Sequence, residues 1–60
     1  MKLYATIEAP EQTQKIFVEG NSYFVCSSDH MSEYYGNPEQ YIKRVLLRAA
    51  QLNKKVVIKR

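Results

Sequence analysis

The sequence of 60 residues contains one cysteine, one histidine and two glycines, and each shortage excludes a class of site. A single cysteine cannot form an intrachain disulfide, and no cluster of cysteine or histidine residues offers ligands for a structural zinc ion. Gly20 and Gly36 lie far apart, so no glycine-rich loop can surround a phosphate group. We therefore expect no metal and no cofactor in this chain.

Long apolar runs are also absent. No segment approaches the roughly 20 apolar residues that a membrane-spanning helix needs, so we expect no membrane partner. No signal-like apolar run follows Met1 and Lys2, and a lone thiol suits a reducing compartment, so we expect a cytoplasmic protein. Residues 1–60 are expected to form one small domain, whose hydrophobic core is barely large enough to stabilise the fold. Because neither a disulfide nor a metal can support this core, close packing or self-association must do so.

Charge is unevenly distributed along the chain. Residues 1–39 carry two lysines and six carboxylates, whereas residues 40–60 carry seven lysines and arginines and no carboxylate. The simplest interpretation is that the two halves attract each other and that their charges are solvated. The alternative is a basic surface for an anionic partner, either nucleic acid or an acidic protein face. The basic patch that would form this surface contains Lys43, Lys54, Lys55, Lys59 and Arg60.

Residues 37–53, NPEQYIKRVLLRAAQLN, predict one long amphipathic helix. Asn37 is a favourable N-cap, and Pro38 suits the first helical position, where its missing N–H has no cost. At 100° per residue, most of the apolar side chains fall on one half of the helix, which we expect to face the core. These side chains are Tyr41, Ile42, Val45, Leu46, Ala49, Ala50 and Leu52.

Three other segments have strand-like patterns. Residues 2–8 alternate between apolar and polar side chains, and residues 55–60 predict a last, short strand. Residues 14–27 predict a hairpin around a two-residue loop, Gly20-Asn21. Residues 28–36 are predicted as a short helix, with an ordered loop as the alternative. We predict that the aliphatic side of the hairpin faces the long helix; it contains Ile16, Val18, Tyr23 and Val25.

These elements predict an α+β fold in which a small four-stranded β-sheet, in β-β-β-α-β order, carries one long amphipathic helix on one face. The connection between residues 27 and 55 is long enough to return the last strand parallel to a neighbour. One helix covers only one face, so the other should be an apolar patch. That open face would show Tyr4, Phe17, Phe24 and Val57. It could be a homodimer interface, a site for another protein, or a stacking platform for single-stranded nucleic acid.

The outer half of the helix offers a second partner-binding surface. Leu47 lies there between Arg44 and Arg48, away from the apolar half. An exposed apolar side chain flanked by arginines is common at the hot spots of protein interfaces. The simpler interpretation is a solvated helix surface.

Two sets of side chains include residue types that catalysis uses. Cys26, Asp29 and His30 are close in sequence, but a nucleophilic cysteine also needs an oriented base and a concave pocket. A small ribonuclease would need His30 or Tyr35 as the proton carrier beside the two helix arginines. Nothing in either spacing requires catalysis, so we expect no catalytic residue.

The sequence therefore predicts a non-enzymatic binding protein. A chain this short that starts at Met1 is more often an accessory binder than an enzyme, as among phage- and plasmid-borne proteins. We expect a regulator or inhibitor of a larger macromolecule, with nucleic-acid-handling machinery as the favoured target. The alternatives are direct RNA or DNA binding through the basic C-terminal third and a small ribonuclease toxin. The expected partners are another protein or protein complex, nucleic acid, or a second copy of the chain.

Overall fold

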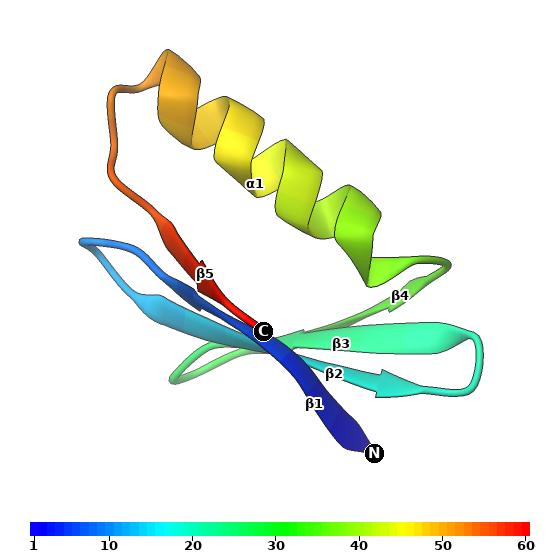
Figure 1. Cartoon of the computed structure of the whole chain (residues 1–60). Coiled ribbons are helices and arrows are strands. Elements are labelled where there is room, and N and C mark those ends of the chain that lie inside the picture. The colour runs from blue at the N-terminus through cyan, green and yellow to red at the C-terminus, as the bar shows by residue number, and fades with distance from the viewer.

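An antiparallel sheet of five strands carries one helix on one face in the computed structural model, which describes residues 1–60 (Figure 1). The α+β prediction is thus confirmed. The elements are β1 (Lys2–Glu8), β2 (Thr13–Glu19), β3 (Ser22–Cys26), β4 (Met31–Tyr35), α1 (Pro38–Gln51) and β5 (Val57–Lys59). The strand order across the sheet is β4-β3-β2-β1-β5, so α1 carries the chain from one edge of the sheet to the other.

The β2–β3 hairpin has the predicted loop and register. Gly20 has a φ of 59°, the positive value that the first residue of a primed two-residue turn can require. Ile16 pairs with Val25 and Phe17 with Phe24, so the aliphatic and phenylalanine side chains point to opposite faces. Ile16 and Val25 are buried with α1 in the core, which confirms that the aliphatic side of the hairpin faces the helix.

The predicted short helix or loop over residues 28–36 is wrong, because residues 31–35 form the strand β4 along the free edge of β3. Tyr34 pairs with Tyr23, and their rings stack with centroids 5.3 Å apart. Just after the strand, the Gly36 N–H donates to the Asn21 carbonyl at 3.0 Å. A helix of about two turns is marginal by itself, and a strand whose five residues all pair with β3 is more stable.

This added strand also changes the direction of β5. The chain reverses once more before α1 than the sequence prediction assumed, and β5 therefore runs antiparallel to its neighbour β1. The prediction of a last strand parallel to its neighbour is wrong for this reason. The pairing joins Thr6 to Lys59, Ile7 to Ile58 and Glu8 to Val57.

A β-bulge in β1 redirects two side chains. Leu3 pairs with Phe17 and Ala5 with Ile16, which leaves Tyr4 as an extra residue. As a result, Leu3 shares the face of Phe17, whereas Tyr4 packs against the core on the helix side. The prediction that Tyr4 lies on the open face is therefore wrong, and Leu3 takes its place there.

Helix α1 begins and ends at signals present in the sequence. The Asn37 side chain accepts a hydrogen bond from the Glu39 backbone N–H at 2.9 Å. At the other end, Asn53 has a φ of 55°, and the Lys54 N–H donates to the Ala49 carbonyl at 2.8 Å. These are the features of a Schellman ending, which satisfies carbonyls that the helix leaves free.

The core between the two layers is small. Only seven residues are buried, namely Ala5, Ile7, Ile16, Tyr23, Val25, Ile42 and Ala49. The predicted apolar half of α1 is wider than its contact with the sheet, because Leu46, Ala50 and Leu52 are exposed. Helix α1 is neither long enough nor apolar enough to cross a membrane.

Candidate interaction surfaces

The sheet surface away from α1, here called the open face, is rich in apolar side chains. Phe17 and Phe24 lie half-buried at its centre on adjacent strands. Around them, Leu3 is 50%, Met31 59% and Tyr35 80% exposed. The apolar members of the open face are Leu3, Phe17, Phe24, Met31, Tyr35 and Val57.

Strand pairing arranges most of the open face in three rows that cross the strands, and a fourth row of Thr13, Glu8 and Val57 lies beyond them at one end. The central row is apolar until it reaches the β4 edge, and the rows on either side each contain one charged residue from β2. The central row contains Leu3, Phe17, Phe24 and Glu33. The lysine row contains Lys59, Thr6, Lys15, Cys26 and Met31, and the glutamate row contains Glu19, Ser22 and Tyr35.

The outer surface of α1 has the second cluster of the predicted site. Leu47 is 61% exposed, and it is flanked by Arg44 and Arg48. Neither arginine takes part in any of the three salt bridges of the molecule. Their charges are therefore available to a carboxylate on another molecule.

Beside these arginines is a groove of about 520 Å³, here called the basic groove. Its apolar wall consists of Ala9, Tyr41, Val45, Ala49, Leu52 and Val56. Its charged lining consists of Glu11, Arg44, Arg48 and Lys54. A salt bridge of 2.5 Å between Lys54 and Glu11 neutralises part of this lining, so the two arginines supply its excess positive charge.

The predicted basic patch is partly neutralised within the chain. Three of its five members bind carboxylates from residues 1–39: the pairs are Lys54–Glu11 at 2.5 Å, Lys59–Glu8 at 3.3 Å and Arg60–Glu39. Lys43 and Lys55 form no salt bridge. The acidic front and the basic back of the sequence thus contact each other, as the simplest interpretation of the charge pattern predicts.

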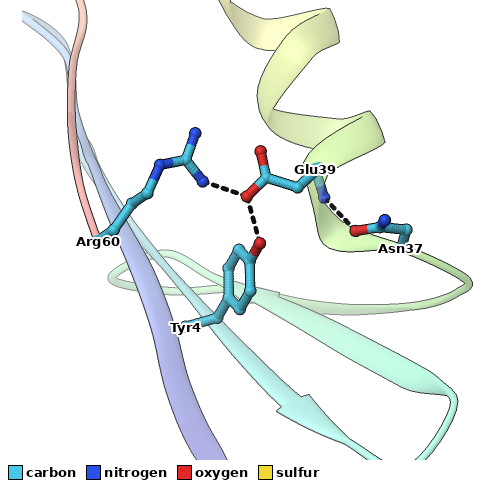
Figure 2. Close-up of polar contacts among 4 residues, drawn as sticks. All are labelled: Tyr4, Asn37, Glu39 and Arg60. Carbon is cyan, nitrogen blue, oxygen red and sulfur yellow. Dashed lines mark hydrogen bonds and ion pairs between the residues drawn. The ribbon is translucent and has the colours of Figure 1, made fainter.

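Glu39 connects three parts of the fold through one carboxylate (Figure 2). The Tyr4 hydroxyl from β1 and the Arg60 guanidinium from the C-terminus both donate to its Oε2 atom. The hydrogen bond from Tyr4, and then that from Arg60, lower the pKa of Glu39 below its ordinary value. The same hydrogen bond to the carboxylate raises the pKa of Tyr4. Figure 2 shows that this contact lies at the first turn of α1.

A cluster of three tyrosines includes Tyr41, which lines the basic groove. Tyr41 lies between the groove and the stacked pair of Tyr23 and Tyr34, with ring centroids 6.3 and 5.8 Å from theirs. Its hydroxyl donates to the Gln14 Oε1 atom at 3.2 Å. Burial raises the pKa of Tyr41, so its hydroxyl stays protonated and remains a donor at neutral pH.

The residues considered for catalysis are not assembled with the arginines. The His30 ring is 3.0 Å from the Ser32 hydroxyl, at the start of β4, and does not line the basic groove. Tyr35 lies on the open face, on the other side of the sheet from α1. Cys26 is half-buried at the end of β3. No group of three or more histidine, cysteine or carboxylate side chains is placed to hold a metal ion.

Sequence reasoning located Phe17, Phe24 and Val57 on the open face but missed Leu3, Met31 and Tyr35. Leu3 was missed because the β-bulge at Tyr4 shifts it to the open face, and the alternation of apolar and polar residues does not reveal a bulge. For the other two, the sequence had no usable signal, because residues 31–35, MSEYY, do not alternate between apolar and polar side chains and the four-residue spacing of Met31 and Tyr35 suits a helix as well as a strand. No protein-family model, no curated protein and no solved structure matches this chain.

Proposed function

We propose that this chain is a small non-enzymatic binding protein that regulates or inhibits a larger macromolecule. It docks the outer surface of α1 against a site on a partner protein that combines carboxylates with an apolar pocket. The observation that carries this proposal is the exposed Leu47 between two arginines that have no carboxylate partner. A cytoplasmic setting suits the single thiol of Cys26, which stays reduced there.

The charges of α1 favour an anionic partner. Arg44 and Arg48 are like charges one turn apart, an arrangement that slightly destabilises an isolated helix. A carboxylate on a partner relieves this repulsion, and a guanidinium can bind it through two parallel hydrogen bonds. Leu47 supplies the apolar anchor that such interfaces concentrate at their centre.

The basic groove extends the same surface. Its apolar wall continues from Val45 to Leu52, next to the side chains of Arg44 and Arg48. An apolar side chain of the partner fits against this wall while a neighbouring acidic residue reaches the arginines. Direct binding of nucleic acid has less support, because three of the five basic-patch residues already bind carboxylates of their own chain.

The test is affinity purification with mass spectrometry from host lysate, using the wild type and three variants. We expect the wild type to retain a protein that is lost with Leu47→Asp and with the double variant Arg44→Glu/Arg48→Glu. Lys55→Glu is the matched control, because Lys55 is exposed, forms no salt bridge and lies outside the groove. This control variant should retain the same protein.

A second measurement separates protein binding from nucleic-acid binding. Labelled single-stranded RNA and DNA are titrated with the wild type at low and at physiological salt. Binding whose affinity falls steeply with salt, together with an identical set of captured proteins for all four chains, would contradict the proposal. Under the proposal, the oligonucleotides stay free at physiological salt.

A further inference from the structure

The open face has a charge pattern that complements itself. On β2, Lys15 and Glu19 lie two residues to either side of Phe17 and share its face. Each is therefore about 7 Å from Phe17 along the strand, in opposite directions. We propose that the open face binds a second copy of this chain, with the two-fold axis running along the central row and across the strands.

This axis exchanges the lysine row and the glutamate row over β2, β3 and β4, while Lys59 and the fourth row lie outside the matched part, where Lys59 binds Glu8 of its own chain. A half-turn about the central row places the lysine row of one copy over the glutamate row of the other, while every strand stays over its own counterpart. Lys15 then meets Glu19 of the second copy, and this pair occurs twice. Sheets packed face to face cross at about 30°, a rotation that long lysine and glutamate side chains can follow near the axis.

The uncharged members of the rows also match. Cys26 is placed over Ser22, and Met31 over Tyr35, where a thioether against an aromatic ring is favourable. On the axis itself, Phe17 meets Phe17 and Phe24 meets Phe24, which buries the centre of the apolar surface. The one contact between like charges is that of Glu33 with Glu33 of the second copy. It lies on the edge strand β4, where water screens the repulsion.

The size of the face and the weakness of the core both favour this occupant. A specific interface buries about 800 Å² on each partner, which is less than a fifth of the 4495 Å² accessible surface of this chain. The molecule has two layers, the sheet and α1, and the open face of the sheet can supply that area. A chain with seven buried residues gains the second hydrophobic layer that small domains otherwise obtain from disulfides or metals.

The dimer is independent of the proposed partner, because the two interactions use opposite layers. Both α1 helices point away from the interface, so the dimer displays Arg44, Leu47 and Arg48 twice, on opposite sides. Such a dimer is bivalent, and it can hold two partner molecules or two sites of one assembly. Substitutions on α1 should leave dimerisation unchanged, so a failure of one proposal is distinguishable from a failure of the other.

Sedimentation equilibrium with charge-swapped variants tests the interface. We expect the wild type to form a species of twice the 7.0 kDa chain mass. Lys15→Glu and Glu19→Lys should each weaken dimerisation by about tenfold or more, since like charges then face each other twice. The double variant Lys15→Glu/Glu19→Lys restores opposite charges across the axis, and it should recover most of the wild-type affinity. Lys43→Glu, on α1, is the matched control and should dimerise like the wild type.

Cysteine crosslinking provides a second, geometric readout. In a Cys26→Ser background, Phe17→Cys places two thiols opposite each other on the axis, and a short bifunctional thiol reagent that spans the roughly 10 Å between packed sheets should yield a covalent dimer. The native Cys26 lies a full row from the axis, so the wild type should crosslink poorly. The proposal is overturned by a monomeric wild type at all concentrations, by single and double charge variants of equal affinity, or by crosslinking of Cys26 in preference to residue 17.

Discussion

At the scale of single residues, Glu39 is the side chain whose ionisation is most closely tied to the fold. Its carboxylate accepts hydrogen bonds from Tyr4 and Arg60, which lie 35 and 21 positions away in the sequence. These contacts join β1, the first turn of α1 and the C-terminus. They also lower the pKa of Glu39, so the folded state favours the ionised carboxylate more than the unfolded state does.

This linkage fixes the sign of a pH effect. A carboxyl whose pKa is lowered by folding stabilises the fold above its unfolded-state pKa of about 4.3 and loses that contribution as the pH falls through the folded value. We therefore expect Glu39→Gln to lower the Tm at pH 7 and to reduce the drop in Tm between pH 6 and pH 3. Thermal unfolding followed by circular dichroism measures both. Asp29→Asn, which removes an exposed carboxylate without a salt bridge outside the strands, should keep the wild-type pH dependence. An unchanged acid-induced drop in Glu39→Gln would show that the carboxylate contributes nothing to it.

At the scale of elements, the sequence was most informative where local signals and packing agree. The hairpin register follows from Gly20-Asn21 and from alternation on both sides of the loop, and the structure has that pairing. The limits of α1 follow from Asn37 and Pro38 at one end and Asn53 at the other. Each of these signals acts within a few residues, so one sequence is enough to interpret it.

The elements that were predicted wrongly depend on distant strands. The bulge at Tyr4 depends on how β1 aligns with β2, and an extra residue in one strand leaves no mark on hydrophobic alternation. β4 forms because β3 offers a free edge, which a local search for helix caps cannot detect. The open face was therefore predicted with Phe17 and Phe24 correct but with Tyr4 in the place of Leu3.

The two sides of α1 should respond very differently to truncation. Ile42 is buried against the sheet, whereas Leu47, one and a half turns further along, is mostly exposed. Ile42→Ala should lower the free energy of unfolding by about 2–5 kcal/mol, because it removes apolar contacts and leaves a cavity. Leu47→Ala should change it by about 0.5 kcal/mol or less. Urea unfolding compares the two variants, and equal losses would contradict the observed orientation of the helix.

At the scale of the whole molecule, the charge asymmetry and the small core have separate consequences. Salt bridges from Lys54, Lys59 and Arg60 to the acidic front hold the C-terminal region against the rest of the chain. These exposed pairs contribute little each, and salt screens them. Arg44, Arg48 and the apolar side chains of the open face are not among the groups that these intramolecular contacts satisfy.

Dimerisation through the open face should make the thermal stability of the molecule depend on its concentration. If folding and association are coupled, mass action stabilises the folded chain as the concentration rises, and the Tm should increase by about 3–5 °C for each tenfold increase. Lys15→Glu should have a lower Tm than the wild type at each concentration, because its dimer is weakened, while the double variant Lys15→Glu/Glu19→Lys should regain most of the wild-type Tm. Calorimetry over a hundredfold concentration range provides the measurement. The Tm of a monomeric fold is independent of concentration. A constant Tm for the wild type would therefore show that packing within one chain, and not dimerisation, stabilises this small core.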